Sequence, residues 1–593
     1  MQERLKRAAA ACLLTFFATP FAGADPAPGD TIIVTATRTE IPLGDAIVPV
    51  SVISREDIEL SLATDLAELL RFEAGIDLGR NGGPGQASSL FVRGTESNHV
   101  LVLVDGVRIN PGTVGGAAVQ HIAPEMIERV EVVKGARSAL FGTDAIGGVI
   151  NIITRRADDA HFEAGAGAGS FDSRSGFVAG GARGTHSDFG AILNWEATDG
   201  FAPRLDSDTR RGYDNVSANL YGSRRFGTTE ISLRHWQAQG NVEYLDFFLT
   251  PVDQDFRNAT TAFELSARPG LRVSTKLVLA RMEDSIHQHQ AEDFVESERL
   301  SLDWQLNAGF ADHTVTGGLY AIEETASALS FGAGFDEDTA VRAAFVQDQW
   351  ARGRHRSFVA LRLTDHESFG NHVTWNAEYA FEISDRLTLN AGLGHAFRAP
   401  DATDRYGFGG SPDLEPELAD EAQLGLRYAP ALRHSFSIEA YANDIRDLIE
   451  FDLETFTLEN ISEAEIRGAE LGYEFRGEKF TFRAALNRQS AEDAATGTWL
   501  LRRAERSATL SLARDFGAHR LGLALLASGD RVDFGGTRLP GYVLANLTGQ
   551  VALGRYWRLT ARIENLLDTD YETAAGFRMQ PRSAFVELAY RWR

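Results

Sequence analysis

Acidic residues gather in one stretch of the chain densely enough to suggest a metal site. Asp206, Asp208 and Asp214 follow one another closely, and four more carboxylates lie between positions 243 and 255: Glu243, Asp246, Asp253 and Asp255. Ca²⁺ prefers several carboxylate and carbonyl oxygens around it. The same composition also suits a loop that is simply solvated, and the residues alone leave both interpretations open.

A second stretch carries groups that could hold a polar ligand. Positions 81–89 read Asn-Gly-Gly-Pro-Gly-Gln-Ala-Ser-Ser, so amides and hydroxyls are mixed with glycines. Amides and hydroxyls offer hydrogen-bond donors and acceptors together. Glycine and serine are also the ordinary residues of turns. The segment is therefore either a ligand loop or a plain connection.

Motifs for catalysis are absent from the sequence. It contains no Gly-x-Ser-x-Gly turn and no His-Glu-x-x-His pair. It also lacks any Gly-Lys dipeptide, and hence a phosphate-binding P-loop. The net charge of −25 disfavours nucleic acid, which attracts basic surfaces. We expect a protein that is not an enzyme, has no cofactor and does not bind nucleic acid.

The first 24 residues have the three parts of a secretory signal peptide. Arg4, Lys6 and Arg7 are basic, an apolar run follows at positions 8–18, and positions 22–24 read Ala-Gly-Ala. An amphipathic N-terminal helix is the alternative, but the order of the three parts favours export. The only cysteine, Cys12, lies in this leader, so no disulfide can form within one mature chain.

Alternation of apolar and polar residues recurs from about residue 160 to the end, as at positions 387–393, 480–487 and 557–564. Such strands can present one face to lipid and the other to a polar lumen. A soluble β-sandwich alternates in the same way. The signal peptide and the number of such segments favour a membrane barrel, because no apolar run reaches the ~18 residues of a membrane helix.

The end of the chain supports this interpretation. Val586, Leu588, Tyr590 and Trp592 stand in phase, as in the aromatic-terminated last strand of outer-membrane barrels. Arg593 after the aromatic residue is a departure from that pattern. The 434 residues from 160 to 593 suffice for about 22 strands, since a tilted membrane strand needs ~9–11 residues. Barrels of that size enclose a plugged lumen.

The residues before the alternating region form a different kind of unit. Short apolar runs at 100–104 and 149–153 are bounded by Asp105-Gly106 and Gly147-Gly148, which indicates strands ended by turns. Charges of both signs are spread through this region. The composition fits a small soluble α/β domain or a charged globule seated in a polar barrel.

Several sequence segments make the chain similar to one family. Positions 88–110 and 129–156 resemble the plug domain of TonB-dependent outer-membrane receptors, most closely the cobalamin (vitamin B12) receptors among them. Three later segments resemble barrel signatures of that family: positions 396–400 (Ala-Phe-Arg-Ala-Pro), 414–417 (Leu-Glu-Pro-Glu) and 565–571 (Asn-Leu-Leu-Asp-Thr-Asp-Tyr).

The resemblance implies an architecture and a compartment. We expect a membrane all-β protein, a 22-stranded antiparallel transmembrane β-barrel with an N-terminal α/β plug domain in its lumen. The expected divisions are a signal peptide (1–24), an N-terminal extension (25–40), the plug (41–156) and the barrel (157–593). The protein is expected in the outer membrane of a Gram-negative bacterium, among outer-membrane lipids, as a monomer.

The extension contains a β-branched run that favours extended backbone. Such a run can add as a strand to a partner's sheet edge. It could also be merely the first strand of the plug. It is similar to the TonB box of the family, over Asp30, Thr31, Ile32, Ile33, Val34, Thr35 and Ala36. The resemblance implies that TonB, supplied with energy by ExbB and ExbD, pulls on this segment.

The resemblance also implies a ligand. It predicts TonB-dependent uptake of cobalamin or a related corrinoid, contacted by Asn81, Gln86, Ala87, Ser88, Ser89, Val114 and Gly115. Gly115 departs from the family, which has a serine-type contact there. Calcium is a candidate structural ion, held by Asp206, Asp208, Asp214 and Asp246. The alternatives are a receptor for a ferric siderophore, haem or another metal chelate, and, more remotely, a passive porin or adhesin.

Overall fold

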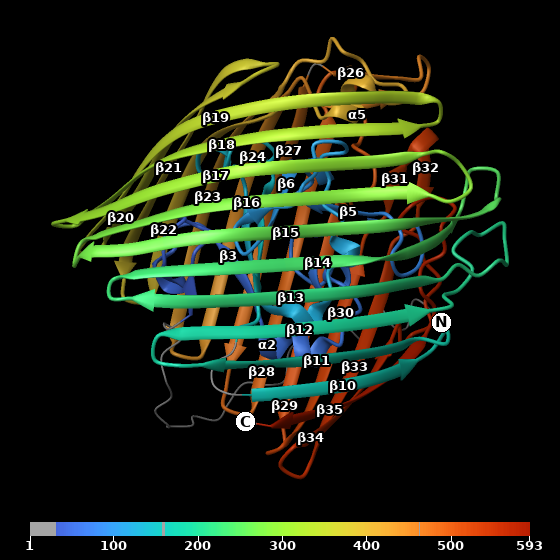
Figure 1. The fold of residues 1–593 in the computed structure, drawn as a ribbon, viewed down its shortest axis with the longest axis horizontal. Helices are drawn as coiled ribbons and strands as arrows, with labels where there is room; N and C mark the ends of the chain where they lie inside the picture. Colours follow the sequence, from blue (N-terminus) through green and yellow to red (C-terminus); the bar gives the residue numbers. More distant parts are fainter. Residues whose placement is uncertain (1–30, 157–160, 462, 593) are drawn as a thin grey trace.

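The computed structural model describes residues 31–156, 161–461 and 463–592. The predicted signal peptide and Asp30 lie outside the described residues, as do residues 157–160 at the predicted boundary between plug and barrel. The predicted division at 156 and 157 therefore stays a prediction. Figure 1 shows a ring of long strands surrounding the N-terminal part of the chain, which is drawn in blue and cyan.

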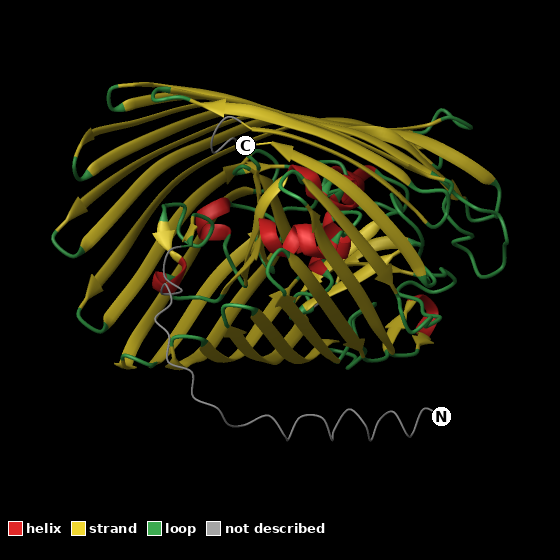
Figure 2. Cartoon of the chain, turned by 90° about the horizontal axis from the view of Figure 1, so that it is seen from below, coloured by secondary structure: helices red, strands yellow, loops and turns green. Residues whose placement is uncertain are grey.

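The N-terminal part is a small α/β unit. A five-stranded sheet with the order β3-β8-β9-β6-β7 forms its centre, and Figure 2 shows short helices beside it inside the ring of strands. Its elements are β1 (Ile32–Ile33), β2 (Ile41–Pro42), η1 (Leu43–Asp45), β3 (Val50–Ser54), α2 (Arg55–Ser61), α3 (Leu66–Leu70), β4 (Ile76–Arg80), β5 (Ser88–Val92), η2 (Ser97–His99), β6 (Val100–Val104), β7 (Val107–Arg108), η3 (Val119–His121), η4 (Pro124–Met126), β8 (Ile127–Lys134), α4 (Ser138–Phe141) and β9 (Gly148–Thr154).

Apolar side chains of the central strands form the core of this plug. Both predicted runs are strands: β6 covers the first, and β9 covers the second with one residue more at each end. Every residue of β6 is buried. Helix α2 begins with a capping box, in which the Ser54 side chain accepts from Asp57 N and the Asp57 side chain accepts from Ser54 N. The predicted α/β plug is thus confirmed.

The rest of the described chain forms a closed antiparallel barrel of 22 strands. The barrel strands are β10 (His161–Gly169), β11 (Arg174–Arg183), β12 (Ser187–Thr198), β13 (Tyr213–Phe226), β14 (Thr229–Leu245), β15 (Pro251–Gly270), β16 (Val273–Gln288), β17 (Phe294–Phe310), β18 (His313–Ser330), β19 (Ala333–Arg352), β20 (His355–His366), β21 (Gly370–Ser384), β22 (Leu387–Arg398), β23 (Glu417–Ala431), β24 (His434–Arg446), β27 (Glu463–Arg476), β28 (Phe480–Asp493), β29 (Arg506–Asp515), β30 (His519–Ser528), β33 (Tyr542–Leu553), β34 (Trp557–Glu564) and β35 (Ser583–Trp592).

The connections of the barrel carry further short elements, namely α5 (Ala402–Tyr406), the hairpin β25 (Ile449–Asp452) with β26 (Thr457–Asn460), and β31 (Arg531–Asp533) with η5 (Phe534–Gly536) and β32 (Thr537–Leu539). The last strand, β35, pairs with β10 and closes the ring, so the predicted C-terminal strand is confirmed. Among the described residues, the helices are all too short or too polar to span a membrane.

The barrel wall has the inverse polarity of a soluble protein. On β13, Asn215 and Ser217 are fully buried, whereas Val216 and Leu220 are 42% and 43% exposed. Polar side chains thus face the lumen and apolar side chains face outward, as expected for a wall surrounded by lipid. A soluble sandwich would bury the apolar face instead, so that alternative is excluded.

The two ends of the barrel differ in their connections. Two residues, 311 and 312, join β17 to β18 at one end, whereas residues 399–416 join β22 to β23 at the other. Outer-membrane barrels have short periplasmic turns and longer extracellular loops. The end that carries the β22–β23 loop therefore faces outward, and the short turns face the periplasm.

Candidate functional site

The N-terminal segment, defined here as residues 31–38, lies folded against the plug. Ile32 and Ile33 form β1, which pairs antiparallel with β2. Ile33 is completely buried and Ala36 is 2% exposed, while Ile32 is 45% exposed. The segment is therefore a short strand of the plug in this state, and its apolar side chains add to the plug's packing.

A buried carboxylate holds the middle of this segment. Glu131, on β8, accepts hydrogen bonds from the backbone N–H groups of Val34 and Thr35, each at 3.0 Å, and from Thr35 Oγ1 at 2.7 Å. Asn151 of β9 in turn donates to Thr35 Oγ1 at 3.0 Å. Hydrogen bonds to a carboxylate are stronger than neutral ones. Glu131 thus fixes the segment to the plug sheet.

The barrel wall holds the end of the segment. Arg38 forms an ion pair with Asp303 of β17, and its carbonyl accepts from Gln305 Nε2 at 3.1 Å. Gln347 of β19 donates to the carbonyl of Thr37 at 2.5 Å. These barrel residues lie toward the short-turn ends of their strands. The segment is therefore secured near the periplasmic opening.

Buried ion pairs hold the plug to the wall. Glu470 of β27 accepts from Arg93 Nε at 2.9 Å and from Lys134 Nζ at 2.6 Å. Arg137 of the plug pairs with Glu378 of β21. Arg93, Lys134 and Arg137 are all at most 5% exposed. Breaking such pairs singly is expensive because it leaves a buried charge uncompensated.

An imidazole of the plug is stacked on the barrel. The ring of His121, in η3, lies on Phe256 of β15 with centroids 3.6 Å apart and planes 7° apart. His121 Nδ1 is 3.2 Å from the hydroxyl of Tyr213. Burial, together with the charge of Arg80, lowers the pKa of His121 to about 3. The ring is therefore neutral at physiological pH and acts as an aromatic contact.

In the first predicted ligand loop, residues 81–89, some side chains form hydrogen bonds with other groups of the protein. Gln86 donates through Nε2 to the carbonyl of Glu243 at 2.7 Å. Ser88 Oγ accepts from Arg80 Nε at 2.8 Å. These two side chains build the loop and anchor it to the barrel, so their polar groups face protein rather than open space.

The other residues of this loop are more open. Ala87 is exposed, while Asn81 and Ser89 are partly exposed. The loop closes on itself through a hydrogen bond from Asn81 N to the carbonyl of Ala87 at 3.1 Å. Gly85 has φ +73°, and a Cβ there would lie 2.1 Å from the Tyr213 ring. The close approach of the barrel explains why this position is glycine.

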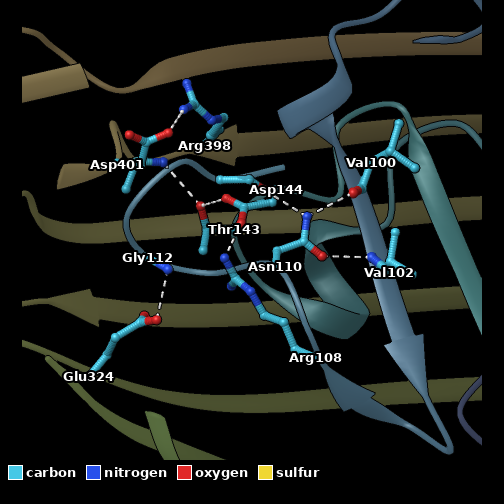
Figure 3. Close-up of polar contacts among 12 residues, drawn as sticks. Val100, Val102, Arg108, Asn110, Gly112, Thr143, Asp144, Glu324, Arg398 and Asp401 are labelled. Atoms are coloured by element: carbon cyan, nitrogen blue, oxygen red, sulfur yellow. Dashed lines mark hydrogen bonds and ion pairs between the residues drawn. The ribbon is translucent and has the colours of Figure 1, made fainter. Parts of the chain in front are cut away.

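The second predicted ligand loop, residues 111–116, is held from two sides (Figure 3). Asn110 is fully buried and donates through Nδ2 to the carbonyl of Gly115 at 2.8 Å. Gly112 N donates to Glu324 Oε1 of β18 at 2.8 Å. The loop therefore has one fixed shape, set by a plug amide and a barrel carboxylate.

Only part of that loop is open to a ligand. Val114 is 45% exposed. Gly115 has φ +64°, and a Cβ there would lie 2.8 Å from Asp401 Oδ2. Any side chain at this position would collide with the barrel, which explains the departure from serine. Val114 thus remains as the accessible contact of the predicted pair.

The four residues predicted to bind calcium are not gathered into a cation site. Asp206 pairs with Arg204 at 3.4 Å. Asp208 lies in the loop before β13 and Asp214 lies within β13, and both are exposed. Asp246 Oδ1 accepts from Phe248 N and Thr250 N within its own turn. Within the described ranges, no three His, Cys, Asp or Glu residues lie so as to hold a metal ion. In this arrangement the residues do not fit calcium, and the site stays a prediction.

Two cavities lie between plug and barrel, with volumes of about 100 and 70 Å³. The smaller one is bordered by the second ligand loop, β18, β19 and α5. Pockets for drug-sized ligands measure roughly 300–1,000 Å³. Neither cavity is large enough for a bulky chelate.

Comparisons with known proteins place these features in a family. The description "TonB dependent receptor-like, beta-barrel" matches residues 156–566, and "TonB-dependent Receptor Plug Domain" matches residues 42–149. The Vitamin B12 transporter BtuB of Vibrio vulnificus (strain YJ016) is 30% identical over 616 residues, covering 97% of this chain and 96% of that protein. The chain belongs to the TonB-dependent receptor family.

Other relatives of this TonB-dependent receptor agree in length and fold. The Vitamin B12 transporter BtuB of Photobacterium profundum is 29% identical, covering 96% of each chain. The ferripyoverdine receptor of Pseudomonas aeruginosa has a TM-score of 0.82 at 14% identity, covering 95% of this chain and 89% of that one. The ferric enterobactin receptor PfeA of the same organism has a TM-score of 0.79 at 17% sequence identity, covering 92% of this chain and 99% of that one. At these identities the two structures show the fold alone.

Family membership fixes compartment and mode of action. The receptor is an outer-membrane β-barrel protein, as predicted. Membership implies TonB-coupled transport of a ligand. The family consists of transport receptors, which is consistent with the expectation that the protein is not an enzyme.

Three buried or ion-paired residues were not predicted from the sequence, namely Glu131, Asp303 and Arg398, the last of which pairs with Glu417 at 2.8 Å. Glu131 left a signal, because a carboxylate within a run of buried strand residues requires a partner. Asp303 is one of many acidic residues on alternating strands, and nothing distinguishes it in the sequence. Arg398 lies within a segment that was identified only as a family signature.

Proposed function

We propose that this receptor takes up cobalamin or a related corrinoid across the outer membrane. The observation that carries the proposal is the 30% identity to a vitamin B12 transporter over nearly the full length of both chains. The first ligand loop supports it, since its partly open residues offer amide and hydroxyl groups to a ligand rich in amides.

In the proposed cycle, TonB pulls on residues 30–36 and supplies the work for transport. ExbB and ExbD deliver the energy of the inner membrane to TonB. The position of the N-terminal segment supports this role, since it is secured at the short-turn end, opposite the ligand loops. Its pairing with β2 involves only two residues. A segment held this way can leave the plug without dismantling the central sheet.

The ligand is proposed to bind outside, between the barrel loops and the two plug loops. Binding shifts the plug so that the N-terminal segment becomes available to TonB. The pull then displaces part of the plug and opens a path to the periplasm. The polar lumen supports this step, because water can replace the protein partners of displaced polar groups. The receptor is proposed to work as a monomer among outer-membrane lipids.

The first prediction concerns the ligand. Purified, detergent-solubilised receptor is expected to bind cyanocobalamin tightly in a titration followed by calorimetry or by corrin absorbance. Neither haem nor a ferric siderophore should compete. If folded receptor instead binds haem or a ferric siderophore and ignores cyanocobalamin, the alternative of a metal-chelate receptor replaces the corrinoid.

The second prediction concerns calcium, which we keep as a proposal for the loaded receptor. Chelation of calcium should weaken cyanocobalamin binding by about tenfold, the size of a typical coupling between two sites. The double variant Asp206→Asn, Asp208→Asn should bind weakly with or without chelator. Asp312→Asn, in the short turn after β17, is the matched control and should respond like the native chain. Binding that is indifferent to chelation would discard the calcium site.

A further inference from the structure

The β22–β23 loop is attached to the plug at several points. Its backbone N–H groups at Ala402 and Thr403 donate to the carbonyls of Gly112 and Thr113, at 3.0 and 2.9 Å. Ala399 N donates to Thr143 Oγ1 of the plug at 3.0 Å. Two of these contacts are made to the second ligand loop itself. An outer loop of the barrel is thus hydrogen-bonded to the part of the plug that is predicted to contact the ligand.

One arginine positions the residues that make these contacts. Arg398, at the end of β22, is completely buried and pairs with Asp401 at 2.9 Å, Asp404 at 2.5 Å and Glu417 at 2.8 Å. Figure 3 shows Arg398 beside Asp401, next to the plug loop that contains Gly112. Asp401 caps α5, accepting from Asp404 N at 2.9 Å. The arginine therefore fixes the start of α5, from which the contacts to the plug loop are made.

The same arginine reaches the plug by a second route. Glu417, which it pairs with, also contacts Nε2 of His99 in the plug at 2.9 Å. The other ring nitrogen, Nδ1, accepts from Glu96 N at 3.2 Å, so Nε2 carries the proton toward Glu417. One cation thus joins three carboxylates, of which Glu417 is buried. These residues connect to the plug in two places, through the backbone of α5 and through His99.

The plug side of this contact continues toward the N-terminal segment. The carbonyl of His99 accepts from Gly147 N at 2.9 Å, immediately before β9 begins. Farther along β9, Asn151 donates to Thr35 of the N-terminal segment. Strand β9 of the plug is thus connected at its start to His99, which contacts Glu417, and farther along to Thr35 of the N-terminal segment.

We propose that Arg398 is a positioning residue, which clasps the second ligand loop of the plug to the β22–β23 loop so that both respond to the ligand together. The proposal deepens the proposed function and rests on it for the ligand. Arg398 itself is buried and does not touch the ligand. Its effect on binding comes from the shape it imposes on residues 111–116.

The clasp, meaning the Arg398-dependent attachment of residues 111–116 to the β22–β23 loop, is tested first without any ligand. The only cysteine in the sequence, Cys12, lies in the predicted signal peptide. In a chain that lacks this leader, Val114→Cys provides a unique site for a spin label on the exposed tip of the loop. The label should be ordered in the otherwise native receptor and clearly more mobile when Arg398→Gln is added. Arg398→Lys keeps the charge without the three-way contact and should fall between the two.

Two further variants complete this test. Arg446→Gln is the matched control, because Arg446 pairs with Asp420 of the wall at 3.0 Å on an exposed surface, and it should leave the label ordered. Gly115→Ser changes no charge but forces a Cβ toward Asp401, and it should loosen the loop as Arg398→Gln does. This variant decides the matter if Arg398→Gln fails to fold. Equal label mobility in all variants would overturn the clasp.

Affinity and response to ligand are measured next, on chains without the label. Arg398→Gln should weaken cyanocobalamin binding by about tenfold, within the range expected for a residue that couples two sites. With Ile33→Cys as reporter, cyanocobalamin should change the rate of thiol labelling in the native background but not with Arg398→Gln. A residue that merely stabilised the fold would lower the yield and leave this response intact.

The two proposals fail in different ways. If the native receptor does not bind cyanocobalamin, the proposed function is wrong, while the mobility of the label at position 114 still decides the clasp. If the native receptor binds it and Arg398→Gln matches the native chain in mobility, affinity and response, the clasp is wrong and the proposed function stands.

Discussion

Deletion of Thr31–Thr35 should reduce cobalamin uptake to background while leaving binding at the cell surface intact. The deleted residues include those that Glu131 holds, and they lie at the opposite end of the plug from the ligand loops. In the proposed cycle TonB binds this segment, so the deletion removes the point at which it pulls. The outer membrane holds no nucleotide supply that could replace that work. Uptake and surface binding of radiolabelled cyanocobalamin should be measured in the same cells.

A matched control separates loss of the proposed TonB-binding segment from a general loss of folding. Glu40 follows the segment, and its exposed side chain lies 3.5 Å from that of exposed Arg268. Glu40→Ala should therefore bind and transport like the native receptor. Uptake that survives the deletion at the native rate would show that the protein is a passive channel, and the proposed coupling would be abandoned.

Replacing Glu470 by alanine should loosen the plug in its barrel. The substitution leaves Arg93 and Lys134 buried without the carboxylate that both contact. Removing one partner of a buried ion pair destabilises a protein by about 3–5 kcal/mol. We expect cells with the variant to become sensitive to large antibiotics such as vancomycin, which an intact outer membrane excludes. Growth at graded antibiotic concentrations measures the leak.

The control for this experiment lies on the same strand. Glu465 of β27 pairs with Arg467 at 2.9 Å, on a partly exposed surface away from the plug. Exposed pairs contribute little to stability, so Glu465→Ala should not raise antibiotic sensitivity. If cells with Glu470→Ala, at native receptor levels, stay as resistant as cells with this control, the buried pairs do not hold the plug.

Local pattern and family resemblance predicted most of the architecture. The apolar run at 100–104 is a strand with the same bounds, because its turn residues end it. The alternating segments are barrel strands, because a strand in a membrane wall must place every second residue in lipid. The number of strands came from the resemblance, since length alone would allow a range.

The candidate site was predictable only in part, because its contacts join residues far apart in the chain. Thr35 and Glu131 are separated by 96 positions, and no local signal pairs them. At Gly115 the resemblance indicated a ligand contact, but whether the residue is open depends on Asp401, which reaches it only in the folded barrel. The predicted calcium ligands are close in sequence, yet among the described residues they are not gathered into a group that could hold a metal ion.

The polar lining of the barrel has a consequence for how often one molecule can be used. Glu470 and Gln347 of the wall hold their plug partners through an ion pair and a hydrogen bond, and water can take the place of each partner when they separate. Hydration of these groups lowers the cost of separating the plug from the wall at its polar contacts. In the proposed cycle the plug can therefore return to its place in the barrel, and a single receptor can serve many rounds of import.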